Sequence, residues 1–388
     1  MKILIVHNEY GNPSGEEHAA QMIADLLKDN GHEVFWFERS SAGLADSVGG
    51  KIKAFFTGIY NPFAAKALAK TIDEVRPDII QVQNLYPLIS PSIFKSIKKR
   101  RIPVVMRCPN YRLFCPNGLH LCNQKVCERC LSFGKELWCV LKNCENNLFK
   151  STGYALRNYF ARITKSILNN VDMYIVQTEF QKKKFIERGV AAERIGIVPG
   201  VIQSTYIQDD KKLGELVTYI GRISIEKGIE DFLEAARLIP EIPFAVAGNN
   251  NHMPDIHNKH PFNVKLLGFL QSNELIDLYQ KSRIIVIPSR WYEGFPNVVL
   301  QAMAQARPIV AARIGALSSI IEDNKNGLLF EPGNKQELAE KIQYLWNQEQ
   351  LCLTLGQAAR KKAQDDYSPK KCYEALINVY IKAEKYKI

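Results

Sequence analysis

The 388-residue sequence lacks long apolar runs, and this limits the classes of protein that it can encode. None of its segments approaches the roughly 20 apolar residues that span a bilayer. The apolar run near its start, residues 3–6, is too short for the core of a signal peptide. We therefore expect a cytosolic protein whose 46% hydrophobic content builds a large core, most naturally in two domains.

The sequence also lacks a recognisable nucleic-acid-binding motif, although its formal net charge is +11. Residues 90–190 hold 19 Lys and Arg against 6 Asp and Glu, so the excess of positive charge belongs to this region. Its basic clusters, 95–101 and 182–184, suit an anionic membrane surface on the inner face of the cell membrane or a pyrophosphate-bearing acceptor. A solvated helix face explains them equally well. We expect no nucleic-acid partner.

Cysteine is scarce outside one segment, because seven of the nine cysteines lie between Cys108 and Cys144. Such density in a cytosolic protein argues against disulfides. Cys127 and Cys130 form a CxxC, and Cys115 with Cys144 would complete four thiolates around a structural zinc ion or an iron-sulfur cluster. There is no second CxxC, so reduced, packed thiols remain the alternative.

Short apolar strands alternate with helical segments in both halves of the chain, which is typical of parallel α/β sheets. In the first half, a strand over 2–8, a turn over 11–15 and a helix over about 16–30 lead to a strand over 32–37. Further strands are predicted over 78–83, 103–106, 173–176, 216–220, 244–247, 264–267, 284–287, 308–310 and 327–330. We interpret the polar stretch 203–214 as a linker. The fold class is therefore α/β, with two Rossmann-like, doubly wound domains facing a central cleft and ligands at the carboxyl ends of strands.

The segment from Pro288 to Ala304 carries the strongest chemical signal. A carboxylate at a strand end, Glu293, is followed by the turn Gly294-Phe295-Pro296 and then by a helix. The unpaired amides of the first turn of such a helix hold phosphate well. A carboxylate beside them accepts hydrogen bonds from vicinal hydroxyls, so a sugar suits it better than a second anion. A purely structural turn is the alternative.

A second segment, residues 219–229, places two cations between a strand and a helix. Arg222 can clamp a phosphate bidentately, and Lys227 can add a point charge, so together they would neutralise a leaving diphosphate without a metal ion. Taken alone, the two side chains read as surface cations. Combined with the Glu293 segment of the same domain, they indicate a binding site.

At this point the sequence resembles glycosyltransferase family 4 with the GT-B fold, over nearly the whole chain. The matching residues are Gly221-Arg222, Glu226-Lys227-Gly228, Leu267-Gly268-Phe269-Leu270, Pro288-Ser289, Glu293-Gly294-Phe295-Pro296, Pro308-Ile309-Val310 and Gly327-Leu328-Leu329. The expected domains are an acceptor-binding domain over 1–205 with a cysteine-rich insert at about 108–144, and a nucleotide-sugar-binding domain over 206–366. A helix over 367–388 is expected to return to the N-terminal domain, as is common in the family.

The resemblance implies transfer of a hexose-type sugar, with retention of configuration, from a UDP- or GDP-sugar to a glycan or lipid-linked acceptor in cell-surface polysaccharide biosynthesis. It implies Arg222, Lys227 and Glu293 as catalytic residues and no metal ion in catalysis. The glycine-rich turn at 11–15 lacks the GxGxxG of an NAD site and resembles the family's loop at the donor, although an ordinary strand-to-helix turn is the alternative. The expected donor-binding residues are Gly15, Gly221, Gly248, Gly268, Phe269, Leu270, Gly294, Phe295, Pro296, Asn297, Val298 and Gln301.

Two departures from the family pattern keep a second interpretation open. Gln301 stands where the family has a second glutamate that holds the donor ribose, and an amide forgoes the stronger charge-assisted bond. Pro109 precedes Asn110-Tyr111-Arg112 where relatives have histidine. The alternative is a degenerate transferase that binds nucleotide sugar or supports a partner enzyme. A nucleotide-linked isomerase or phosphorylase of the same fold is less well supported, since fold alone does not fix function.

Overall fold

The computed structural model describes residues 1–10, 15–44, 46–131, 134–202, 212–251, 253–258 and 260–386. The chain divides into two compact units: unit 1 comprises residues 1–122, 127–199 and 372–388, and unit 2 comprises residues 123–126 and 200–371. Residues 11–14 of the glycine-rich turn and residues 203–211 of the predicted linker lie outside the described part of the chain.

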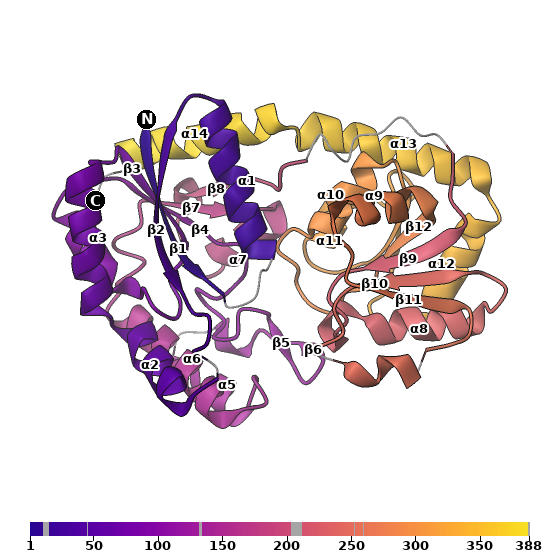
Figure 1. The fold of residues 1–388 in the computed structure, drawn as a ribbon, viewed down its shortest axis with the longest axis horizontal. Coiled ribbons are helices and arrows are strands. Elements are labelled where there is room, and N and C mark those ends of the chain that lie inside the picture. Colours follow the sequence, from indigo (N-terminus) through magenta and orange to yellow (C-terminus); the bar gives the residue numbers. More distant parts are fainter. Residues whose placement is uncertain are drawn as a thin grey trace. The chain divides into compact units, whose positions relative to one another are not determined.

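Unit 1 is built on a parallel sheet of six strands in the order β2-β1-β3-β4-β7-β8 (Figure 1). The strands are β1 Lys2–Glu9, β2 Glu33–Ser40, β3 Ile79–Asn84, β4 Val104–Arg107, β7 Met173–Val176 and β8 Ile195–Ile197. The helices are α1 Gly15–Asp29, α2 Val48–Ile59, α3 Pro62–Val75, α4 Phe94–Lys98, α5 Leu137–Leu141, α6 Leu148–Ile163, α7 Glu179–Ile186 and α14 Pro369–Lys385. A two-stranded hairpin, β5 Leu121–Cys122 and β6 Lys125–Val126, lies within the cysteine-rich segment.

Unit 2 is built on a second parallel sheet of six strands, in the order β11-β10-β9-β12-β13-β14. The strands are β9 Leu216–Ile220, β10 Phe244–Ala247, β11 Val264–Gly268, β12 Ser282–Ile287, β13 Ile309–Ala312 and β14 Leu328–Phe330. The helices are α8 Ile229–Leu238, α9 Ser272–Lys281, α10 Asn297–Ala304, α11 Leu317–Ile320, α12 Lys335–Trp346 and α13 Glu349–Asp366. Central strands such as β12 and β13 are almost wholly buried, which explains why they read as continuous apolar runs.

Several helices begin where a polar side chain can satisfy a first-turn amide. Ser47, Asn61, Asn147 and Thr178 precede α2, α3, α6 and α7, and each side chain accepts a hydrogen bond from a backbone amide three residues further on. In α3 the next residue is Pro62, whose ring suits the first helical position. Local sequence therefore sets these helix starts.

The predicted fold class is confirmed, because each half of the chain forms its own parallel α/β sheet. The predicted strand over 264–267 is β11, and that over 284–287 is the end of β12, which begins two residues earlier. The helices α2, α5 and α6 and the β5–β6 hairpin were not predicted from the sequence. In the described part of the chain, no helix is both long enough and apolar enough to cross a bilayer.

Candidate functional site

The candidate site of unit 2 lies where two neighbouring strands end. β9 pairs with β12, with Tyr219 opposite Val286, whereas β10 and β11 lie on the other side of β9. The strand order therefore reverses between β9 and β12. Ligands of open α/β sheets bind at such switch points, outside the carboxyl ends of the strands. The loops that follow β9 and β12 carry the three residues predicted to be catalytic.

Glu293 is the centre of this site. Its side chain is buried, and its Oε1 atom accepts hydrogen bonds from Ser289 Oγ at 2.7 Å and from Trp291 Nε1 at 3.0 Å. The same oxygen lies 2.7 Å from Nζ of Lys227. No hydrogen bond among the described residues uses Oε2, so the second oxygen can accept from a ligand hydroxyl.

Lys227 reaches Glu293 because the two loops are in direct contact. Gly228 has φ +74°, and a Cβ atom at this position would lie 1.8 Å from the carbonyl oxygen of Pro288, so only glycine fits. Nζ of Lys227 also lies 5.3 Å from the ring centroid of Trp291, which is within cation–π range. The lysine keeps about a quarter of its side chain exposed and remains accessible to an anion.

Arg222 lies in the same loop but makes a different contact. Its Nη2 atom is 3.0 Å from Oε1 of Glu226, and its side chain is half exposed. The Tyr219 hydroxyl donates to the Arg222 carbonyl oxygen at 2.6 Å. Burial raises the pKa of Tyr219 well above its usual value, and the charges of Glu293 and Glu226 add to this shift while Arg222 opposes it. Arg222 and Glu293 therefore both act on one buried tyrosine.

The turn after Glu293 leads into α10, whose N-terminus lacks a side-chain cap among the described residues. Its first amides, from Asn297 and Val298, therefore suit an anion. Phe295 has a supporting role, because its buried ring packs against Tyr367 with centroids 5.2 Å apart. Gln301, one turn into α10, accepts a hydrogen bond from the Tyr279 hydroxyl at 2.9 Å.

Three glycines predicted to bind the donor lie on adjacent loops of unit 2. The amide of Gly221 donates to the carbonyl oxygen of Ala247, and the amide of Gly248 donates to that of Gly268. A Cβ at Gly248 would lie 1.7 Å from the Gly221 carbonyl oxygen, so this close approach requires glycine. Next to Gly268, the Phe269 side chain is 75% exposed, and Leu270 is half-buried.

Four side chains of the unit 2 site had no predicted role. Tyr219, Glu226, Ser289 and Trp291 all lie in the segments 219–229 and 288–304, so their positions were visible while their contacts were not. Two alternating positions near a strand end, Ser289 and Trp291, were a usable signal: both carry donors that can reach a carboxylate two to four residues further on.

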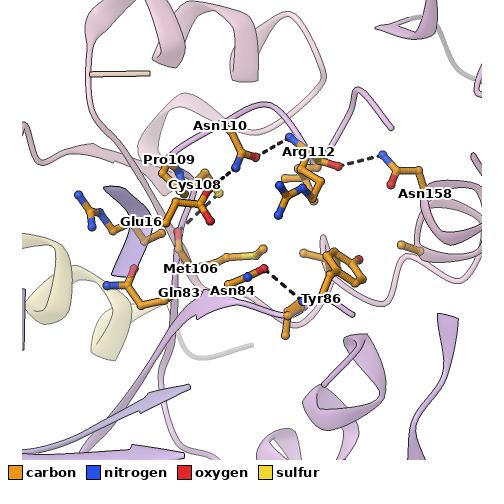
Figure 2. A pocket seen from close by; sticks show the side chains of 15 residues that line it. Glu16, Gln83, Asn84, Tyr86, Met106, Cys108, Pro109, Asn110, Arg112 and Asn158 are labelled. Carbon is orange, nitrogen blue, oxygen red and sulfur yellow. Dashed lines mark hydrogen bonds between the residues drawn. The ribbon is translucent and has the colours of Figure 1, made fainter. Parts of the chain in front are cut away.

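Unit 1 has a pocket of its own at the carboxyl ends of β3 and β4 (Figure 2). Its lining includes Asn84 from β3, Arg107 from β4, Asn110 and Arg112 from the following loop, and Glu16 from the first turn of α1. Pro109, the predicted departure from the family's histidine, also lines it. Of the charged residues here, Glu16 and Arg107 were missed, although each stands at a strand or helix end where parallel sheets bind ligands.

A chain of hydrogen bonds fixes the polar lining of this pocket. Nδ2 of Asn110 donates to Oε1 of Glu16 at 2.6 Å, and its Oδ1 accepts from the Arg112 amide at 3.0 Å (Figure 2). Asn158 Nδ2 donates to the Arg112 carbonyl oxygen at 2.9 Å, and the Arg112 guanidinium donates to the Tyr10 hydroxyl at 2.5 Å. Asn110 and Arg112 are thus held in place before any ligand binds.

Arg107 supplies a buried cation to the same pocket. Only 4% of the residue is exposed, and burial lowers its pKa, an effect that the charge of Glu16 opposes. Its Nε atom has no hydrogen-bond partner within the described ranges. A buried, incompletely paired donor is costly unless a ligand or water satisfies it. The pocket is therefore suited to a hydroxylated or anionic ligand.

Gly15, the predicted donor-binding residue of the N-terminal half, is the first residue of α1. Just before the undescribed segment 11–14, the amide of Tyr10 donates to Oε1 of Glu17 at 2.8 Å. The predicted role of the glycine-rich turn falls largely on residues outside the described part of the chain and stays a prediction.

The four cysteines predicted as metal ligands lie within electrostatic reach of one another. Burial raises the pKa of Cys130 to about 12, and Cys115, Cys144 and Cys127 add to the shift. Nevertheless, no three His, Cys, Asp or Glu side chains in the described ranges are placed to hold a metal ion. The thiols as arranged do not fit a zinc or iron-sulfur site, and the metal prediction stays a prediction that metal analysis of protein purified without a histidine tag can test.

The two Rossmann-like units together define the GT-B fold. Residues 207–362 match the model of the family described as Glycosyl transferases group 1. The chain has the same fold as the crystallised Anabaena protein HepE in complex with UDP, with a TM-score of 0.68, 18% identity and coverage of 98% of this chain and 100% of that one.

Two curated relatives give a closer match in sequence. An uncharacterised glycosyltransferase of Methanocaldococcus jannaschii is 30% identical over 221 residues, which are 56% of this chain and 61% of the relative. The capsular polysaccharide biosynthesis glycosyltransferase CapM of Staphylococcus aureus is 26% identical over 231 residues, which are 53% of this chain and 60% of the relative. The matched regions thus span about three fifths of the length of these relatives.

Proposed function

We propose that this protein is a retaining glycosyltransferase that uses a UDP- or GDP-sugar to glycosylate a glycan or lipid-linked acceptor in polysaccharide biosynthesis. The observation that carries the proposal is the contact of Lys227 with Glu293 at the switch point of unit 2, beside the uncapped N-terminus of α10. The match of residues 207–362 and the names of the relatives support it.

In this proposal, unit 2 holds the donor. The diphosphate contacts the α10 amides, Lys227 and, after it releases Glu226, Arg222. Oε2 of Glu293 accepts hydrogen bonds from sugar hydroxyls, while Ser289 and Trp291 hold the carboxylate in place. The nucleobase lies near Gly268 and Phe269, whose exposed ring offers a stacking surface.

The transfer step follows from this arrangement. The bond between the anomeric carbon and the diphosphate oxygen breaks, and the acceptor oxygen forms its bond to the same face of that carbon. The acceptor's proton passes to the departing phosphate oxygen, so the products are the nucleoside diphosphate and the glycoside. Positive charges and helix amides stabilise the negative charge that develops on the leaving group. We propose that no metal ion is needed, because Lys227 and Arg222 supply this charge.

The acceptor in this proposal binds the pocket of unit 1. Asn110, Arg112 and Arg107 are positioned donors, and Glu16 can accept from a hydroxyl group. This composition favours a hydroxylated acceptor, and the two arginines suit one that also carries phosphate.

The test is incubation of the purified chain with a panel of UDP- and GDP-sugars, with and without EDTA, while nucleoside diphosphate release is measured. Donor-specific release that EDTA does not affect, and that Lys227→Ala lowers by orders of magnitude, supports the proposal. Saturable binding of a nucleotide sugar without turnover points to the degenerate transferase. Two observations favour that alternative: Gln301 is hydrogen-bonded to Tyr279, and Pro109 lines the pocket of unit 1. The absence of both binding and turnover overturns the proposal.

A further inference from the structure

Unit 1 exposes large apolar side chains on α2. Val48, Ile52 and Phe56 follow one another at intervals of four residues, so they share one face of the helix. Val48 and Phe56 are largely exposed and Ile52 is 45% exposed, while Phe63 at the start of α3 reaches 84%. The packed side of α2 adjoins this face: Gly58 is buried, and the Phe55 ring lies 5.0 Å from that of Phe149. Val48, Ile52 and Phe56 thus remain exposed beside the packed side of α2.

Large apolar side chains are also exposed on α5 and α6, which Figure 1 shows grouped with α2 in unit 1. Leu137 and Leu141 of α5 are exposed, as are Leu148, Phe160 and Ile163 of α6. An ion pair between Glu136 and Arg162 joins the start of α5 to the end of α6. We call the exposed apolar side chains of these three helices, together with the lysines between them, the α2–α5–α6 surface.

The charges on this surface have one sign. Residues 47–63 contain two lysines and no acidic residue. Residues 137–165 contain five basic residues and a single acidic one, Glu145, which is already paired with Lys150 at 2.6 Å. The remaining exposed lysines, Lys51, Lys53, Lys142 and Lys165, have no carboxylate partner within the described ranges.

Exposed apolar side chains gathered in this way are costly in water, and globular proteins seldom expose large apolar areas without a partner. The combination of Leu, Ile and Phe with Lys, and with almost no acid, matches interfacial helices that lie in the headgroup region of a bilayer. No described helix is able to span the bilayer, so such binding would remain at its surface. A protein partner would need a face that is both acidic and apolar and that matches this surface in shape. An anionic bilayer is acidic at its headgroups and apolar beneath them, and it needs no matching shape.

We propose that the α2–α5–α6 surface docks the protein on an anionic lipid bilayer. The apolar side chains enter the boundary between headgroups and acyl chains, and the four lysines contact the lipid phosphates. The basic clusters at 95–101 and 182–184 are a weaker choice, because neither range contains an exposed large apolar side chain. The inference goes beyond the proposed function and does not depend on it.

The experiment is co-flotation of the full chain with vesicles of phosphatidylcholine alone and of phosphatidylcholine with 30% phosphatidylglycerol. The wild type should bind the anionic vesicles at least tenfold more tightly than the neutral ones. Ile52→Glu with Phe56→Glu should lower anionic-vesicle binding about tenfold or more, because charge replaces two apolar groups that would enter the bilayer. Leu141→Glu on α5 tests the surface through a second helix, and Lys51→Ala with Lys53→Ala should reduce the preference for anionic lipid.

The matched control is Phe262→Glu in unit 2, where the side chain is also largely exposed and lies outside this surface. Its vesicle binding should equal that of the wild type, and thermal unfolding should show that all variants are folded.

The proposal is wrong if the wild type does not float with anionic vesicles, or if the α2 and α5 variants bind them as well as Phe262→Glu does. A wild-type dimer in light scattering that the α2 variant dissociates would assign the surface to a second copy and also overturn the proposal. Donor turnover, measured without vesicles, should be unchanged in every variant, so failure here is separate from failure of the proposed function.

Discussion

Nζ of Lys227 lies 2.7 Å from Oε1 of Glu293, although 66 positions separate the two residues. The side chain of Glu293 is only 5% exposed, so the ion pair is largely removed from water. A buried carboxylate needs its partners, and here it has a cation and two neutral donors on one oxygen. The pair thus holds the partly exposed lysine beside Glu293 and leaves the second carboxylate oxygen for a ligand.

The first prediction concerns Lys227→Ala. In the proposed function this change removes a positive charge that stabilises the leaving diphosphate, and we expect nucleoside diphosphate release to fall about 10²- to 10³-fold. Loss of the ion pair also leaves Glu293 with neutral donors alone, so the melting temperature should fall as well. Steady-state kinetics with the preferred donor check the first effect, and Lys265→Ala, which removes an exposed lysine of unit 2, is the control. Equal activity of the two variants would remove Lys227 from the mechanism.

The location of this pair could be predicted from the sequence, because the end of an apolar run indicates the end of a strand. The run ending at Ile220 and the run ending at Ile287 are both followed by polar loops, and parallel strands bring such loops to one edge of the sheet. The sequence thus identified Arg222, Lys227 and Glu293 as one group. It could not identify Glu226 as the partner of Arg222, because that choice depends on the course of the loop.

Other features depended on long-range packing that no local pattern reports. Arg107 becomes a pocket residue only because β4 lies beside β3 and near the start of α1. The helix α2 escaped prediction because two adjacent glycines, Gly49 and Gly50, disfavour a helix locally. Its apolar residues lie on both the solvent side and the packed side of the helix. The sequence therefore lacks the amphipathic pattern that usually identifies a surface helix.

The second prediction tests the contact between the two loops through Gly228→Ala. Both the positive φ and the 1.8 Å approach to the Pro288 carbonyl oxygen oppose a Cβ atom here. We expect a loss of about 2 to 4 kcal/mol in the free energy of unfolding, and a fall in turnover as Lys227 moves away from Glu293. The matched control is Gly333→Ala, which has φ +83° but no atom within 4 Å of the added Cβ. It should lose only about 1 to 2 kcal/mol and keep its turnover. Denaturant unfolding measures both losses. Equal losses of unfolding free energy in the two variants would mean that the contact between Gly228 and Pro288 relaxes at no energetic cost.

The third prediction concerns Gln301→Glu, which introduces the acid that the family pattern has at this position. The Tyr279 hydroxyl can donate to a carboxylate as it does to the amide, so the position should tolerate the change. Charge-assisted hydrogen bonds are about twice as strong as neutral ones, and the proposed ribose contact should therefore lower the KM for the donor several-fold. Gln350→Glu, on the exposed start of α13, controls for the added negative charge. An unchanged KM in Gln301→Glu would indicate that position 301 does not contact the donor.

The last prediction follows from the thiols of the cysteine-rich segment. Burial raises the pKa of Cys115 and of Cys122 to about 11 and that of Cys130 to about 12, whereas an unfolded thiol titrates at about 8.5. Above that pH the unfolded chain loses thiol protons that the folded chain retains, so the free energy of unfolding should decline as the pH rises from about 9 toward 11. The stabilisation should be complete below pH 8.

Comparison with Cys130→Ala isolates this effect, because raised tyrosine pKa values act equally in both proteins. Under reducing conditions, the melting temperature of the wild type should fall about 3 °C further than that of Cys130→Ala between pH 8 and pH 10.5. If the two proteins lose the same number of degrees, the Cys130 thiol ionises in the folded protein as readily as in the unfolded one. Because a bound metal would hold these sulfurs as thiolates at neutral pH, that outcome, together with stoichiometric zinc or iron in untagged protein, would instead support the metal site predicted from the sequence.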